Sequence, residues 1–174
     1  MTRPRVDGRA GRASGRRWLR GLWIRDSTYT FRVKFWGTRG SIACPGPDTV
    51  KDGGNTTCCE VTCGSRRIII DAGTGIRALG KKIMLEEGNI LNTDIFFTHT
   101  HMDHIQGLPF FAPLYNPKNN VRLHSGHLQP PYDLQGLIGT MLMKDPIFPV
   151  PSSLIEQACT FNDYNCGQVF EPEK

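Results

Sequence analysis

Three of the five histidines of this chain lie within six residues, together with one aspartate. The run is His99-Thr100-His101-Met102-Asp103-His104, and it directly follows an apolar stretch at 94–98 that has a strand pattern. Neutral imidazole and carboxylate are ligands for zinc and similar divalent ions. Residues two apart in a loop can project to one side. We therefore expect His99 and His101 to bind one ion together, and Asp103 and His104 to reach a second ion.

Two neighbouring divalent ions can hold a hydroxide near neutral pH and stabilise the oxygens of a displacement reaction. The run by itself therefore predicts a His/Asp site for divalent metal ions. Its position supports this interpretation, because open α/β sheets place ligand sites beyond the carboxyl ends of their strands. The alternative is a set of solvated surface histidines, which the density and position of the run disfavour.

The sequence around this run alternates between strand and helix patterns. Apolar alternation and β-branched residues predict strands, and 3.6-residue periodicity predicts helices. A further helix that begins at residue 105 is interrupted by Pro109 and Pro113. Together the elements place the chain among mixed α/β folds. The term α/β is used here in the broad sense that includes α+β folds. The predicted strands are 28–36, 55–63, 68–70, 94–98, 121–125, 158–162 and 168–170, and the predicted helices are 76–87 and 132–143.

Positive charge is concentrated at the N-terminus. The net charge of the 174 residues is +5, but residues 1–32 hold nine arginines and two acids, and residues 33–174 are slightly acidic. Residues 1–27 have too little apolar surface to form a core, so we expect a disordered basic tail before a domain at 28–174. An early start codon or an organellar presequence is an alternative. A twin-arginine export signal is excluded, because charged residues interrupt its apolar stretch.

The remaining composition is that of a soluble protein, with 39% apolar and 21% charged residues. No apolar run is long enough to cross a bilayer, so no membrane partner is expected. The six cysteines include no Cys-x-x-Cys pair. We therefore expect reduced structural thiols and a cytoplasmic location.

The histidine run, followed by Gly107-Leu108, resembles the metal-binding motif of the metallo-β-lactamase-fold hydrolase superfamily. The segment 68–75 (IIIDAGTG) resembles the strand and aspartate turn that precede this motif there. Segments 35–41 and 53–58 resemble the opening of a subgroup near tRNA-processing RNase Z and cyclic-nucleotide phosphodiesterases. The resemblance extends from about residue 31 to residue 115. It implies an αββα sandwich, of which this chain carries the N-terminal half.

The same resemblance implies a role for each residue of the motif. His99 and His101 would bind the first metal, and Asp103 and His104 the second. Asp103 would also act in catalysis by positioning the bridging water. Asp71 would brace the metal loop, with a simple turn-forming role as the alternative. The implied cofactors are two divalent metal ions, with zinc expected and manganese or iron as alternatives.

The chain also departs from the family pattern. The family's third histidine, bridging aspartate and last histidine lie in the second half of its fold, and this sequence stops at Lys174, about where the segment leading to the third histidine is expected. Catalytic metal sites usually have three protein ligands. We therefore expect the sequence to be a fragment. For the remaining histidines, His124 and His127, we expect polar surface roles, with ligation as the alternative.

The resemblance implies a metal-dependent hydrolase, in which a metal-bound hydroxide attacks an electrophilic centre. The resemblance to the subgroup implies a phosphodiester substrate, either a nucleotide or a nucleic acid, and disfavours β-lactam hydrolysis. Two rival functions stay open. The chain could be a non-catalytic remnant that binds metal or serves as an interaction piece, or it could bind nucleic acid through its arginine-rich tail. The sequence does not fix the oligomeric state. Half of a sandwich would expose the sheet face that normally packs on the other half, so instability or aggregation is expected.

Overall fold

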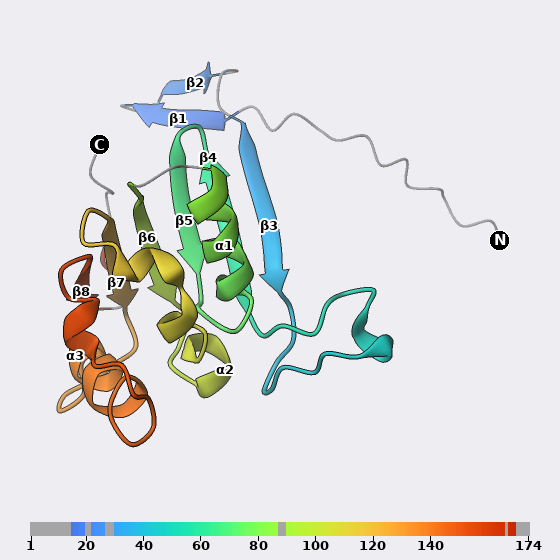
Figure 1. The fold of residues 1–174 in the computed structure, drawn as a ribbon. Coiled ribbons are helices and arrows are strands. Elements are labelled where there is room, and N and C mark those ends of the chain that lie inside the picture. Colours follow the sequence, from blue (N-terminus) through green and yellow to red (C-terminus); the bar gives the residue numbers. More distant parts are fainter. Residues whose placement is uncertain (1–14, 20–21, 27–29, 87–89, 166, 170–174) are drawn as a thin grey trace.

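The structure, a computed structural model, describes residues 15–19, 22–26, 30–86, 90–165 and 167–169. Its centre is one six-stranded sheet in which spatial order follows chain order, from β3 to β8 (Figure 1). The pairs β3–β4 and β4–β5 are antiparallel, and the pairs from β5 to β8 are parallel. The strands are β3 (Phe31–Gly37), β4 (Cys58–Cys63), β5 (Arg66–Ile70), β6 (Asn92–Phe97), β7 (Asn120–Ser125) and β8 (Cys159–Asp163).

Helices connect the parallel strands, as the sequence predicts for mixed α/β folds. The longest is α1 (Ile76–Glu86), between β5 and β6, and its apolar residues Ile76, Leu79 and Ile83 are buried. None of the helices that the structure describes is long and apolar enough to span a membrane. The shorter helical elements are η1 (Pro47–Thr49), α2 (Met102–Ile105), η2 (Leu108–Phe110), η3 (Ala112–Tyr115), α3 (Leu134–Leu137), η4 (Ile138–Leu142) and η5 (Ser152–Leu154).

Most predicted elements are present with boundaries shifted by a few residues, and three segments differ. The helix expected after residue 105 is a pair of 3-10 turns, η2 and η3, because each begins with a proline near its first position. The helix predicted at 132–143 is divided into α3 and the π-helical turn η4. Residues 168–169 are not in a strand, and residue 170 lies outside the described residues.

Part of the segment predicted as a disordered tail is extended. Strands β1 (Gly15–Leu19) and β2 (Leu22–Asp26) pair antiparallel, with Trp18 in register with Trp23. Both strands carry aromatic and aliphatic residues, which favour strand structure. The rest of residues 1–29 lies outside the described residues, and the division of the chain near residue 28 stays a prediction.

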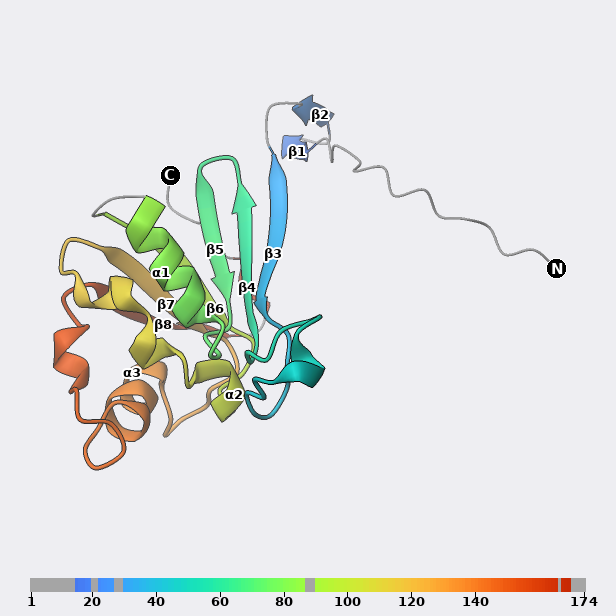
Figure 2. The ribbon, with the colours of Figure 1, turned by 45° about the vertical axis from the view of Figure 1, so that its right-hand side comes forward.

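The two faces of the sheet differ in what covers them. Alternate residues of the central strands, including Ile69, Ile95 and Leu123, face α1 and α3 and are fully buried. Figure 2 shows both helices on the same side of the sheet. The hydrophobic core therefore lies between the sheet and this helical layer.

The opposite face is apolar but largely uncovered among the described residues. Phe31, Val33 and Phe35 project from β3 on this face, and Phe35 is 67% exposed. Their cross-strand neighbours Val61 and Ile68 are only half-buried. An exposed apolar patch of this kind favours association with another apolar surface.

We therefore expect the chain to self-associate as its concentration rises, and the variant Val33→Thr/Phe35→Thr to reduce this association. Threonine keeps the β propensity of the strand while it removes apolar area. Sedimentation velocity over a concentration series measures the effect. The control Val50→Thr/Ile147→Thr changes two other exposed apolar residues, which lie outside this face, and should leave association unchanged. If the two variants associate equally, the exposed face of β3 is not the surface through which the chain self-associates.

Candidate metal centre

The candidate site lies at the carboxyl ends of β5 and β6. These strands are parallel, with Ile70 in register with Phe96, so the residues that follow them emerge at the same edge of the sheet. The backbone N–H of Asp71 donates to the carbonyl of Phe96 across this edge, at 2.9 Å. Asp71 and the histidine run, distant in sequence, are thereby placed next to each other.

The three histidines of the run lie close together. The ring centroids of His99 and His104 are 4.0 Å apart, and those of His99 and His101 are 4.6 Å apart. The Oδ2 atom of Asp103 lies 3.5 Å from Nε2 of His104. The structure therefore brings together all four residues predicted as metal ligands, on the turn after β6 and the first residues of α2.

Asp71 contacts this cluster directly. It is buried, and its Oδ2 atom lies 2.8 Å from Nδ1 of His104. This contact is a hydrogen bond when the proton of His104 is on Nδ1, and Nε2 then carries the lone pair that a metal needs. The φ angle of Asp71 is 61°, in the left-handed region that aspartate tolerates better than most residues. The contact is the one expected of a bracing residue, and the functional role itself stays a proposal.

Thr98 links Asp71 to a second histidine. Its backbone N–H donates to Oδ1 of Asp71 at 2.8 Å, and its Oγ1 lies 2.9 Å from Oδ2. The same Oγ1 is 3.1 Å from Nδ1 of His99. A proton on His99 Nδ1 would be accepted by Thr98, whose hydroxyl then donates to Asp71, so that Nε2 of His99 also carries a lone pair. Sequence reasoning missed Thr98, although its place between the strand and the run was visible.

Asp103 is held by a distant loop. The backbone N–H of Ser41, in the glycine-rich loop after β3, donates to Oδ2 of Asp103 at 2.7 Å. This hydrogen bond is the main cause that lowers the pKa of Asp103, and His104 and His99 contribute electrostatically. The carboxylate is therefore ionised at neutral pH. Ser41 could not be found from the sequence, because its contribution comes from the backbone.

Backbone contacts fix the turn after β5 against α2. The N–H of Ala72 donates to the carbonyl of His104 at 2.7 Å, and the N–H of Gly107 donates to the carbonyl of Ala72 at 2.8 Å. A Cβ atom on Gly107 would collide with the carbonyl of Gly73. A Cβ atom on Gly73 would in turn collide with the carbonyl of Asp103. These two close approaches explain why glycines stand at both positions.

The donor chemistry of the cluster suits a divalent cation such as zinc, since it combines neutral imidazoles with an ionised carboxylate. Nevertheless, within the described ranges no group of three His, Cys, Asp or Glu side chains is arranged so that it could hold a metal ion. The ligand assignments therefore stay predictions.

The other two histidines have different surroundings. The surface role expected for His124 is wrong: its ring is 1% exposed, stacks on Phe96 and lies 2.9 Å from Oδ1 of Asp94. His127 is half-buried, and its Nε2 lies 3.1 Å from Oγ1 of Thr100. Thr100 is the residue between His99 and His101 in the sequence. His124 therefore belongs to the sheet, whereas His127 borders the candidate site.

The environment of His124 predicts a pH-dependent stability. Burial lowers the pKa of His124 below its usual value, although Asp94 partly opposes this effect. Below about pH 6.5 the unfolded chain would bind a proton that the folded chain resists, so stability is expected to decrease as the pH falls from about 7 to about 5.

The variant His124→Gln tests this prediction, because glutamine can still donate to Asp94 but does not titrate. Arg122 also donates to Asp94, at 2.7 Å, and is unchanged in the variant. Urea unfolding at several pH values should show a weaker pH dependence for the variant than for the unchanged chain. Identical slopes would show that His124 does not contribute.

Comparisons with known proteins agree with this fold. No protein-family model matches the chain. Ribonuclease Z of Clostridium kluyveri is 32% identical over 120 residues, which are 66% of this chain and 36% of that protein. The crystal structure of unliganded yeast PDE1 has a TM-score of 0.51 and 15% identity, over 82% of this chain and 53% of that one. A Thermotoga maritima protein assigned as a metallo-beta-lactamase has a TM-score of 0.41 and 19% identity, over 76% of this chain and 59% of that one.

These findings confirm the resemblance to the metallo-β-lactamase-fold superfamily, and with it the mixed α/β fold class. The chain spans about a third of the length of the Ribonuclease Z sequence that it matches. The matched Ribonuclease Z has the name of one of the two kinds of protein whose opening segments the sequence resembles.

Proposed function

We propose that this chain is part of a cytoplasmic, metal-dependent hydrolase that acts on phosphodiesters of nucleotides or nucleic acids. Two kinds of observation support the proposal: the clustered donors after β6 and the similarity to Ribonuclease Z. The free thiols of Cys44, Cys58, Cys59, Cys63 and Cys159 suit a reducing compartment.

The observation that carries the proposal is the contact between Asp71 and His104. A buried carboxylate that fixes the tautomer of an imidazole is the arrangement that orients metal-binding histidines. A solvated surface histidine has no need of such a partner. The contact therefore favours a ligand role for His104, and Thr98 extends the same arrangement to His99.

Each residue of the cluster then has a defined task. His99 and His101 would hold one divalent ion, and Asp103 and His104 a second, with zinc as the expected metal. A divalent ion bound there would supply Lewis acidity and an activated water. Asp71 keeps a proton on Nδ1 of His104, and the ionised Asp103, oriented by Ser41, would accept a hydrogen bond from the attacking water.

A hydrolysis assay with bis(p-nitrophenyl) phosphate tests the proposal, with Zn²⁺ or Mn²⁺ added. We expect activity that falls at least ~100-fold in the variant His99→Ala/His101→Ala, since a catalytic metal lowers the activation barrier by several kcal/mol. The control Lys118→Ala/Lys144→Ala changes exposed residues outside the site and should retain activity. A preference for a phosphomonoester or a β-lactam, or equal activity of the two variants, would contradict the proposal.

A metal-binding piece without turnover is the second candidate. Catalytic metal sites usually have three protein ligands, whereas weak metal binding needs only a pair such as His99 and His101. The two candidates are separated by measuring metal binding and hydrolysis on one preparation. Metal that binds through His99 and His101 without hydrolysis would support the binding piece.

A further inference from the structure

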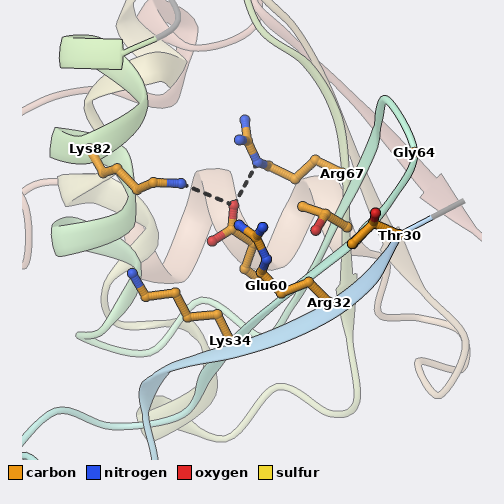
Figure 3. A pocket seen from close by; sticks show the side chains of 8 residues that line it. Thr30, Arg32, Lys34, Glu60, Gly64, Arg67 and Lys82 are labelled. Atoms are coloured by element: carbon orange, nitrogen blue, oxygen red, sulfur yellow. Dashed lines mark hydrogen bonds and ion pairs between the residues drawn. The ribbon is translucent and has the colours of Figure 1, made fainter. Parts of the chain in front are cut away.

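A basic pocket lies away from the candidate metal centre, between the first three strands of the main sheet and α1. It has a volume of about 300 Å³, and its charged lining residues are Arg32, Lys34, Glu60, Arg67 and Lys82. Figure 3 shows these side chains converging on one space. Four cations and one carboxylate give this pocket an excess of positive charge. The excess is a local feature, because residues 33–174 as a whole are slightly acidic.

The single carboxylate holds two of the cations in place. Oε1 of Glu60 lies 2.9 Å from Nε of Arg67 and 3.7 Å from Nζ of Lys82. Figure 3 shows that these two side chains approach Glu60 from different elements, β5 and α1. The other carboxylate oxygen accepts a hydrogen bond from Nε1 of Trp36 at 2.9 Å. Glu60 is buried, so it orders its partners while it offsets only one of the four positive charges.

A third cation is also ordered. Nζ of Lys34 lies 3.8 Å from the centroid of the Trp36 ring, which is a cation–π contact. Arg32, two residues earlier on β3, projects on the same face of the strand and is exposed. An anion that enters the pocket thus meets charged groups that are largely held in position beforehand, which lowers the entropic cost of binding it.

Phosphate is the anion that best matches this lining, since arginine and lysine side chains are its usual protein contacts. The position of the pocket favours a chain of phosphates over a single one. Arg67, near the start of β5, and Asp71, directly after its end, are about 13 Å apart at the usual rise of a strand. One extended polynucleotide strand could therefore place a phosphate in the pocket while a bond a few nucleotides away lies at the candidate metal centre.

We propose that this pocket binds the phosphate backbone of a single-stranded polynucleotide. The inference rests on the proposed function, because the bound phosphates would be those a few nucleotides away from the bond that is hydrolysed. The pocket would then add affinity for long substrates over mononucleotides without touching the reacting atoms.

The first test is a lysine footprint of the full chain in EDTA, so that binding is measured without hydrolysis. A short single-stranded RNA of mixed sequence is bound, and exposed lysines are acetylated and identified by mass spectrometry. We expect the RNA to protect Lys34 and Lys82 several-fold, and to leave Lys118 and Lys144 unprotected. Protection of all four lysines to the same extent, or of none, would overturn the proposal.

The second test uses fluorescence anisotropy with the same RNA. The variant Arg32→Glu/Lys34→Glu should weaken binding about tenfold more than the control Lys118→Glu/Lys144→Glu, which makes the same change in net charge. The slope of log affinity against log salt should also become shallower by about 1.4, which corresponds to two lost phosphate contacts on a single strand. Arg32→Gln/Lys34→Gln provides a milder variant, and thermal melts check that each variant is folded.

If the two charge-reversal variants weaken RNA binding equally, the pocket is not the RNA-binding site. If inorganic phosphate or a mononucleotide competes as strongly as RNA does, the pocket is a site for single phosphates and not for a polynucleotide. Failure of hydrolysis in the separate assay leaves both of these measurements interpretable, because they need neither metal nor turnover.

Discussion

Replacing Asp71 with asparagine is expected to weaken Zn²⁺ binding about 10- to 100-fold while the chain stays folded. Asparagine tolerates the left-handed backbone conformation of this residue and still offers an oxygen to the backbone N–H of Thr98. Its amide nitrogen, however, would donate to Nδ1 of His104, where the carboxylate accepts. The proton of His104 would then move to Nε2, and the lone pair needed for the metal would be lost.

The variant Asp71→Ala separates this effect from a structural one. Alanine leaves the partly buried donors of Thr98 and His104 without this acceptor and is strained at a positive φ, so we expect a loss of about 2 kcal/mol in the free energy of unfolding. Nitrogen-15 NMR of the histidine rings reports the tautomer of His104 in each variant. Unchanged metal affinity and tautomer in Asp71→Asn would contradict the bracing role.

Replacing Gly107 with alanine is expected to destabilise the chain by about 3 kcal/mol, at the upper end of the usual effect of overpacking. The φ angle of Gly107 is −82°, which alanine adopts readily, so backbone strain is not the cause. The cause is the added Cβ, which would collide with the carbonyl of Gly73 and separate the turn after β5 from α2. His104 precedes Gly107 closely on this segment, so metal binding should weaken as well.

Gly40→Ala is the matched control for this prediction. A Cβ atom at Gly40 would meet nothing within 4 Å. Since it also reduces the freedom of the unfolded chain, this substitution should be neutral or slightly stabilising. Urea unfolding of both variants gives the comparison, and equal stabilities would show that the contact between Gly107 and Gly73 is looser than described.

The sequence predicts most of the sheet and the histidine cluster, because both depend on local patterns. The apolar stretch before His99 marks β6, and the helical spacing of Ile76, Leu79 and Ile83 marks α1. The resemblance of 68–75 to a known aspartate turn also identified Asp71 as a bracing candidate before the contact with His104 was visible.

What the sequence did not predict depends on contacts between distant segments. Ser41 approaches Asp103 from 62 positions away and through its backbone, which leaves no pattern of residue types. His124 was expected at the surface, but pairing with β6 buries it against Asp94. The basic pocket was missed for the same reason, because Lys82 and Arg67 converge on Glu60 only after α1 has packed on the sheet.

The most direct test of the central claim is a Zn²⁺ titration of the full chain against a chromophoric chelator, with His99→Ala/His101→Ala measured beside it. If these histidines form a metal centre, the unchanged chain will bind Zn²⁺ at least ~10-fold more tightly than the variant, and elemental analysis will find zinc that the variant lacks. Equal affinities and equal zinc contents would show that the histidine run does not bind metal in this chain.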